Sequence, residues 1–198
     1  NPNKPELMWG GPIAGGSGDF KELAQTWSKP AVAFIKLKGY EERPVLIFGA
    51  GYDTNKDNSS LSEDSKGRGI FIVDAETGEK VWALTPSENG FQGKHSIAAD
   101  ITLLDSDYDG YIDRLYAADT GGDVWRVDMP SDNPKSSKQP WTHFKLASFS
   151  AKTASQDRRF FYKPVVARSL FSKVTETNIN GKSTITRIDT PFDAVLLG

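Results

Sequence analysis

The chain contains no cysteine, which excludes disulfides, thiolate nucleophiles and cysteine-based zinc ribbons. It has two histidines, His95 and His143, which are too few and too isolated to indicate a zinc site. We expect His95, next to a strand start, to be a structural residue. No run of about 18 apolar residues occurs, so no segment is expected to span a bilayer. The net charge of −2 lacks the strongly basic balance of proteins that bind nucleic acids or anionic membranes.

Long segments with a 3.6-residue hydrophobic period are also missing. The apolar runs are short, rich in Val, Ile, Phe, Tyr and Trp, and separated by clusters of Gly, Asn, Asp or Pro. This pattern is typical of an all-β protein built from antiparallel hairpins. One short helical turn is expected near "DFKELAQ", where Asp19 could cap it.

The apolar runs repeat along the chain. "KPAVAFI", "HSIAADI" and "KPVVARS" begin at residues 29, 95 and 163, so the starts are 66 and 68 residues apart. The first two units hold four runs each, and a third unit begins. We therefore predict four-stranded antiparallel blades with long loop insertions, such as "DTNKDNSSLSEDSKGR" and "PSDNPKSSKQP". Residues 1–198 would form about two and a half blades of a larger β-propeller.

The ends of the chain point to a longer parent. The first residue is Asn1 rather than Met, and the closing "FDAVLLG" resembles a strand that is interrupted. We expect the chain to be a fragment.

The stretch "DSDYDGYID" places acidic residues at alternate positions around a glycine. In calcium loops, carboxylates at positions 1, 3 and 5 surround one ion, glycine at 6 permits a sharp bend, and residue 7 offers its carbonyl. Position 12 is Tyr116 rather than the usual Glu, and both flanks resemble strands. We predict a nine-residue Ca²⁺ loop joining two strands, with Mg²⁺ less favoured. The predicted ligands are the side chains of Asp105, Asp107, Asp109 and Asp113 and the carbonyl of Tyr111.

An ion-free, solvated hairpin turn is the alternative for this stretch. A second stretch, from Asp53, offers Asp53, Asn55 and Asp57 at the same spacing, but it lacks the glycine and has Leu61 at the ninth position. We interpret it as a polar loop tip, and a second ion site stays an open alternative.

Other motifs for chemistry are weak. "GGSGD" does not fit a nucleophile elbow, and "GAGYDT" lacks the helix that a dinucleotide fingerprint requires. The tryptophans in or beside predicted strands are expected to pack blades together, and stacking on a sugar or cofactor is the alternative. These residues are Trp27, Trp82, Trp125 and Trp141.

Two resemblances follow from these motifs. "IFIVDAETGEKVWAL" resembles the repeat of quinoprotein-type propellers, in which a Thr-Gly turn joins the last two strands and the Trp docks between blades. Alone, it implies a pyrroloquinoline-quinone dehydrogenase or a scaffold of that fold. The longer succession "LAQTWSKPAVAFIK", "PVLIFGAGYDTNKD", "DITLLDSDYDGYIDRLYAADTGGDVWRVDM" and "RRFFYKPVVA" resembles the carboxy-terminal domain of the PilY/PilC family of type IV pilus-tip adhesins and biogenesis proteins.

The family resemblance implies a modified quinoprotein-like propeller without quinone or enzymatic activity. It implies that Ca²⁺ held by Asp105, Asp107, Asp109, Tyr111 and Asp113 opposes pilus retraction. It also implies surface adhesion, twitching motility and virulence, with minor pilins or other pilus-tip components as partners. Host or abiotic surfaces would be contacted by a variable region of the parent.

The implied location is the bacterial surface, at the pilus tip and outer membrane, after export through the periplasm. No Arg-Gly-Asp tripeptide occurs in the chain, so integrin binding is not implied. The rival hypotheses are a fragment of a quinone-dependent dehydrogenase and a propeller assembly scaffold without a regulatory metal.

Overall fold

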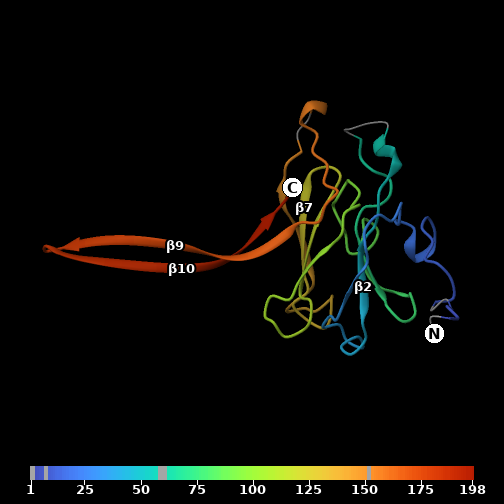
Figure 1. Cartoon of the computed structure of the whole chain (residues 1–198), viewed down its shortest axis with the longest axis horizontal. Coiled ribbons are helices and arrows are strands. Elements are labelled where there is room, and N and C mark those ends of the chain that lie inside the picture. The colour runs from blue at the N-terminus through green and yellow to red at the C-terminus, as the bar shows by residue number, and fades with distance from the viewer. Residues whose placement is uncertain (1–2, 7–8, 58–61, 151–152) are drawn as a thin grey trace. The chain divides into compact units, whose positions relative to one another are not determined.

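The computed structural model describes residues 3–6, 9–57, 62–150 and 153–198. The chain divides into two compact units, Asn1–Lys163 and Pro164–Gly198. Its regular structure is almost all β, which confirms the predicted class (Figure 1). The helical elements of the described residues are three 3₁₀ turns, η1 (Gly18–Phe20), η2 (Thr54–Asp57) and η3 (Ala154–Gln156). None of the described helical segments is long and apolar enough to cross a membrane.

The first unit begins with a four-stranded antiparallel sheet. Its strands are β1 (Ala31–Ala33), β2 (Val45–Gly49), β3 (Ile70–Asp74) and β4 (Lys80–Leu84), paired in chain order. Every residue of β3 is buried, because this inner strand is covered on both faces. Thr77 and Gly78 lie in the turn between β3 and β4, as the quinoprotein-type resemblance implies.

A second sheet of the same design follows. Its strands are β5 (Thr102–Leu104), β6 (Arg114–Ala118), β7 (Asp123–Asp128) and β8 (Thr142–Ser148), again antiparallel and in chain order. Two consecutive four-stranded sheets confirm the predicted antiparallel units. Closure of such sheets into a propeller stays a prediction.

The second sheet begins later in the sequence than the repeat predicts. The run "HSIAADI" from His95 was expected to start with a strand. Strand β5 begins only at Thr102. Ile97 donates its N–H to the carbonyl of Gly67 (2.8 Å) and accepts from the N–H of Gly51 (3.0 Å). This segment is buried and bonded to loops of the first sheet, so its backbone groups are not available for a strand ladder.

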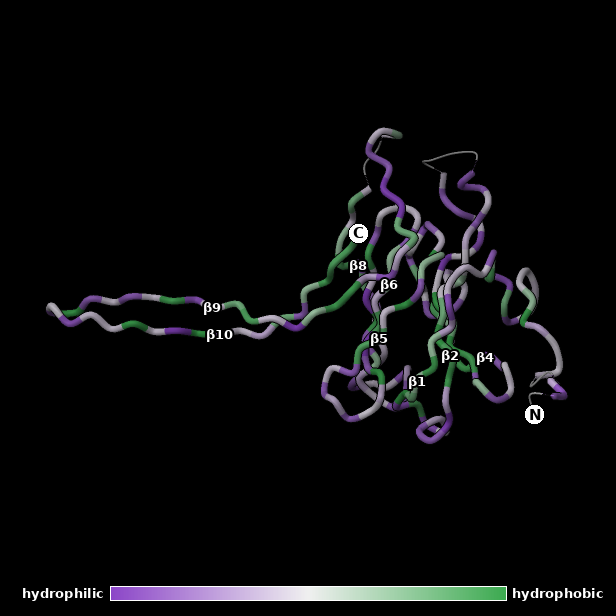
Figure 2. The backbone as a smooth tube through the Cα atoms, viewed as in Figure 1, coloured by the Kyte–Doolittle hydropathy of each residue, from purple (hydrophilic) through white to green (hydrophobic). Residues whose placement is uncertain are grey.

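The main core lies between the inner faces of the two sheets. Alternate residues of β2, β3 and β4 point into it and meet residues of β6 and β7, as the period of two requires. The rings of Trp82 and Trp141 meet edge to face at 5.2 Å, and those of Phe91 and Trp125 at 4.7 Å. Figure 2 shows hydrophobic positions concentrated in the strands of the two four-stranded sheets and hydrophilic positions in the loops that connect them.

The opposite face of the first sheet carries a smaller core. Phe48, Phe71, Val73 and Ala83 pack there with Leu23 from the amino-terminal segment. Near that segment, the expected helical turn is present as η1. Its predicted cap is wrong, because Asp19 lies inside the turn and pairs with Lys80 at 3.0 Å.

The tryptophan prediction holds for three residues and is wrong for Trp27. Trp82, Trp125 and Trp141 are buried in the main core, whereas Trp27 is 67% exposed. Trp27 lies in an exposed connection before β1, and its ring contacts that of Tyr52 at 5.8 Å.

The second unit is a single hairpin of β9 (Val165–Ile179) and β10 (Lys182–Leu196). The two-residue turn Asn180–Gly181 joins them, a sequence typical of tight hairpins. The two strands pair without interruption, from Val165 opposite Leu196 to Ile179 opposite Lys182. The closing "FDAVLLG" therefore belongs to a continuous strand that runs from Lys182 to Leu196.

Candidate metal centre

The acidic stretch is the connection between β5 and β6, as predicted. Its base is fixed by the sheet, because Leu104 pairs with Arg114 and the N–H of Asp113 donates to the carbonyl of Leu104 at 3.1 Å. A short loop between two paired strands has little conformational freedom, so its side chains are held near one another.

Three of the predicted ligands converge. Asp105, Asp107 and Asp109 each place a carboxylate oxygen within 4.8 Å of the others. The loop curls through two residues in the left-handed region, Tyr108 with φ 63° and Gly110 with φ 94°. A Cβ on Gly110 would meet no atom within 4 Å, so the need for glycine is conformational rather than steric.

Backbone N–H groups of the loop help to hold this geometry. The carboxylate of Asp105 accepts from the N–H of Asp109 (3.2 Å) and of Gly110 (2.8 Å). One oxygen of Asp109 accepts from the N–H of Tyr111 at 3.0 Å. Carboxylate oxygens have further lone pairs, so these bonds leave acceptor capacity for a cation.

Asp113, the predicted ninth-position ligand, lies at the base of the loop. Its carboxylate accepts from the N–H of Ser106 (3.2 Å) and from the hydroxyl of Ser106 (2.6 Å). It is not part of the converging group of three. Ligation by Asp113 and by the carbonyl of Tyr111 stays a prediction.

Lys36, which sequence reasoning missed, completes the cluster. It lies in the connection between β1 and β2, and its ammonium group bonds to Asp109 and lies 3.6 Å from Asp107. The hydrogen bond with Lys36 lowers the pKa of Asp109, and the same bond raises the pKa of Lys36. The two connections also meet through their backbones, since the N–H of Ile112 donates to the carbonyl of Phe34 at 2.8 Å.

The donor set suits a hard divalent cation. It offers carboxylate oxygens without nitrogen or sulfur, which is the chemistry that Ca²⁺ prefers in proteins. The ammonium of Lys36 compensates part of the repulsion between the carboxylates, as a bound cation would do more fully. The residues therefore fit a calcium ion.

The second acidic stretch does not form such a group among the described residues. Asp53 accepts from the N–H and the hydroxyl of Ser65 at 2.7 and 2.8 Å, and Asp57 accepts from the hydroxyl of Tyr52 at 2.6 Å. Asn55 donates its backbone N–H to Asp53 at 3.0 Å. These bonds favour the loop-tip interpretation. Leu61, at the ninth position, lies outside the described residues.

The histidines have structural surroundings. His95 lies against Gly121, where an added Cβ would come 1.8 Å from Cδ2 of His95. Burial lowers the pKa of both His95 and His143. Neither belongs to a metal-binding group within the ranges that the structure describes.

The fold and the loop together define a class: an all-β protein of tandem four-stranded antiparallel sheets with an oxygen-donor loop between neighbouring strands. No protein-family model matches the chain. It is 29% identical over 116 residues to the type IV pilus biogenesis factor PilY1 homolog of Xylella fastidiosa, covering 58% of this chain and 7% of that protein. It is 27% identical over 129 residues to the type IV pilus biogenesis factor PilY1 of Pseudomonas aeruginosa, covering 65% of this chain and 9% of that protein.

Among solved structures, the carboxy-terminal domain of Pseudomonas aeruginosa PilY1 matches 81% of this chain and 34% of that chain. The TM-score is 0.48 and the sequence identity is 20%. The matched regions span less than a tenth of the curated relatives. The two sequence matches confirm the resemblance to the PilY/PilC family that the motifs predicted. Over these matched regions the chain is similar to PilY1.

Proposed function

We propose that this chain is a calcium-binding, non-enzymatic domain of a type IV pilus biogenesis factor, and that its acidic loop regulates pilus extension against retraction. The observation that carries the proposal is the convergence of Asp105, Asp107 and Asp109 within a loop held by paired strands. The relation to PilY1 supports the assignment to pilus biogenesis.

Ion binding would act by fixing the loop. A divalent cation neutralises carboxylates that otherwise repel one another, and it replaces the ammonium of Lys36 as their counter-charge. Binding to the native state alone stabilises it by about 2.7 kcal/mol at a hundredfold excess over Kd. The ordered loop would then present a fixed surface beside β5 and β6 to a minor pilin or another pilus-tip component.

In the pilus, the calcium-loaded state would oppose retraction, in line with the family resemblance. The protein would lie at the cell surface, at the pilus tip and the outer membrane, after export through the periplasm. Adhesion to host or abiotic surfaces, and hence virulence, would depend on parts of the parent outside this chain. Twitching motility would follow from the balance between extension and retraction.

Calorimetry tests the ion site directly. We expect Ca²⁺ to bind the wild-type chain with one ion per molecule, and more tightly than Mg²⁺. Asp109→Ala should abolish this binding while far-ultraviolet circular dichroism stays unchanged. Asp132→Ala removes one exposed carboxylate outside the loop and should bind as the wild type does. No heat and no melting shift at millimolar Ca²⁺ for the wild type would instead favour a plain assembly scaffold.

The pilus role needs a separate test in a piliated bacterium that carries the full-length protein. Asp109→Ala should reduce the number of surface pili, because retraction is no longer opposed. Deleting the retraction motor in the same strain should restore them. Wild-type piliation in the Asp109→Ala strain would contradict the regulatory role even if calorimetry has confirmed the ion.

A further inference from the structure

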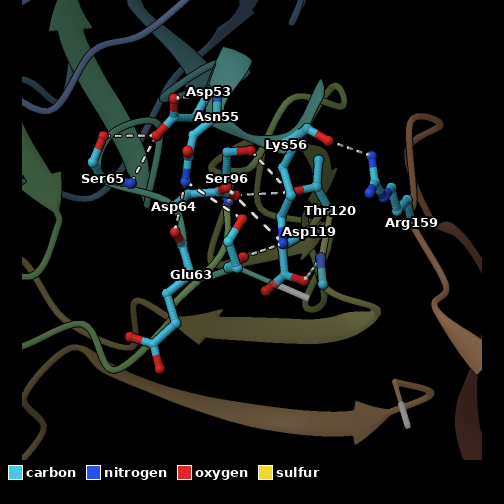
Figure 3. A network of polar contacts seen from close by, with 12 residues as sticks. Asp53, Asn55, Lys56, Glu63, Asp64, Ser65, Ser96, Asp119, Thr120 and Arg159 are labelled. Carbon is cyan, nitrogen blue, oxygen red and sulfur yellow. Dashed lines mark hydrogen bonds and ion pairs between the residues drawn. The ribbon is translucent and has the colours of Figure 1, made fainter. Parts of the chain in front are cut away.

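A second polar cluster lies away from the acidic loop, between the connection that precedes β3 and the loops of the second sheet (Figure 3). At its centre are Lys56, from η2, and Asp64. Neither has any exposed side-chain surface, and Nζ of Lys56 lies 4.0 Å from Oδ1 of Asp64. Arg159 donates to the backbone carbonyl of Lys56 at 3.1 Å and holds this backbone in place. Two opposite charges are therefore side by side without contact with solvent.

The hydrogen bonds of the pair are unequal. Oδ2 of Asp64 accepts from the N–H of Ser96 (2.7 Å) and from the hydroxyl of Thr120 (3.0 Å). Nζ of Lys56 donates to the carbonyl of Ser62 at 2.5 Å. Oδ1 of Asp64 is buried and has no hydrogen-bond partner among the described residues. An ionised carboxylate with one unsatisfied oxygen is costly in such surroundings.

Removing an ion pair from water costs the hydration of both charges. Burial lowers the pKa of the Lys56 ammonium, the change that turns a lysine into a nucleophile. A proton that passes from Nζ to Oδ1 removes both buried charges. What remains is an amine beside a carboxylic acid in a site that excludes water.

We propose that Lys56 and Asp64 condense without a cofactor into an amide bond between Nζ and Cγ, which cross-links η2 to the segment before β3. Nζ lies 4.0 Å from Oδ1, the oxygen bonded to Cγ, so a small change in the Lys56 side chain would bring Nζ within a near-attack distance of Cγ, about 3–3.5 Å.

The chemistry balances within the pair. After the first proton transfer, the lone pair of Nζ attacks Cγ, and negative charge develops on Oδ2. The two donors on Oδ2, from Ser96 and Thr120, are placed as the donors of an oxyanion hole are. A second proton passes from Nζ to Oδ1, the Cγ–Oδ1 bond breaks, and Oδ1 leaves as water. No oxidant, reductant or co-reactant is needed.

The product keeps the favourable contacts of the site. Its single N–H can still donate to the carbonyl of Ser62, and its oxygen can still accept from Ser96 and Thr120. The unpartnered oxygen and both charges are gone. Water is kept from the bond by the same burial, so hydrolysis is disfavoured once the link has formed.

Intact-mass spectrometry of the denatured wild-type chain tests the proposal. We expect a mass one water below that of the sequence, and tryptic mapping should give a single peptide of residues 39–66, uncut after Lys56 and one water lighter, because no Lys or Arg lies between Lys56 and Asp64. Lys56→Arg should show its full sequence mass. Asp64→Asn should lose ammonia instead of water, and it should therefore reach the same mass as the cross-linked wild type.

The chain supplies a matched control. Lys94 and Glu63 approach to 2.5 Å, closer than Lys56 and Asp64, but their side chains are 66% and 63% exposed. Because their charges are solvated, they should stay uncoupled in the same tryptic map. A wild-type chain with its full sequence mass and ordinary tryptic cleavage after Lys56 would overturn the proposal. This readout on the wild type does not depend on whether a variant folds.

Discussion

Lys36 and Asp109 form an ion pair that ties the β1–β2 connection of the first sheet to the acidic loop of the second. The carboxylate that bonds to this ammonium is also one of the three oxygen donors proposed for Ca²⁺. A bound calcium ion would therefore compete with Lys36 for Asp109. Ion binding would release the β1–β2 connection from this contact, so occupancy of the loop is coupled to an element of the neighbouring sheet.

The competition predicts that removing the ammonium strengthens calcium binding. Lys36→Gln should lower the Kd for Ca²⁺ by roughly threefold to tenfold at low ionic strength, because a positive charge no longer opposes the incoming cation. Calorimetry at two salt concentrations measures the effect, which should shrink at the higher one. Lys38→Gln removes an exposed charge from the same connection and should change the Kd much less. Equal effects of the two variants would show that only general electrostatics is involved.

The left-handed backbone at Gly110 predicts a conformational requirement in the loop. Gly110→Ala places a side chain at φ 94°, which costs about 1–3 kcal/mol although no neighbouring atom is close. We expect lower stability in urea unfolding and weaker calcium binding. Gly11→Ala is the control, because Gly11 also has no atom within 4 Å of an added Cβ but does not have a left-handed backbone. If both variants bind Ca²⁺ as tightly as the wild type, the turn at Gly110 does not shape the site.

Asp119 predicts a pH dependence of stability. Its buried carboxyl accepts from the N–H groups of Gly121 and Asp123 and from the indole of Trp125, and burial raises its pKa to about 6. The folded state binds this proton more tightly than the unfolded state does. Stability from this group is therefore complete below about pH 4 and is lost as the pH rises toward 6, by roughly 1.4 kcal/mol per pH unit.

Urea unfolding between pH 4 and 7 measures this slope. Asp119→Asn should be less stable overall. Its amide has one acceptor oxygen, so it cannot accept both from the Trp125 indole and from the backbone N–H groups of Gly121 and Asp123. The difference in unfolding free energy between wild type and Asp119→Asn should shrink as the pH rises from 4 to 6. The unfolding free energy of the exposed control Asp132→Asn should change with pH as that of the wild type does. A constant difference between wild type and Asp119→Asn would contradict the raised pKa.

The contact between Trp82 and Trp141 predicts that Trp82 contributes much of the free energy of unfolding by packing the two sheets together. Trp82→Ala should cost about 3–5 kcal/mol of unfolding free energy, because it empties a buried site between the sheets. Trp27→Ala removes the same side chain from an exposed position and should cost less than about 1 kcal/mol. Denaturant titration followed by circular dichroism compares them. Similar losses would mean that Trp82 does not join the sheets.

Strands and the acidic loop were predictable because their signals are local. The runs that became β2, β3, β6 and β7 are bounded by turn residues, and the period of two fixes which residues face the core. The loop places its acidic residues within nine consecutive positions, so the spacing alone indicates their convergence.

Long-range contacts were not predictable in this way. Nothing near Lys36 indicates that it reaches Asp109, because their approach depends on how the two sheets pack. The burial of Lys56 beside Asp64 depends likewise on Ser96 and Thr120, from distant loops. Trp27 was misassigned because an aromatic residue beside a strand carries no signal of the side to which it points.

The loop between β6 and β7 has no room for side chains at two consecutive positions. A Cβ on Gly121 would overlap His95, and one on Gly122 would come 2.9 Å from the carbonyl of Arg158, at φ 85°. We therefore expect two adjacent glycines, eight residues after the acidic loop, in any chain that builds this corner in the same way. A sequence that has the acidic residues but bulkier side chains at these two positions must build this corner of the sheet differently.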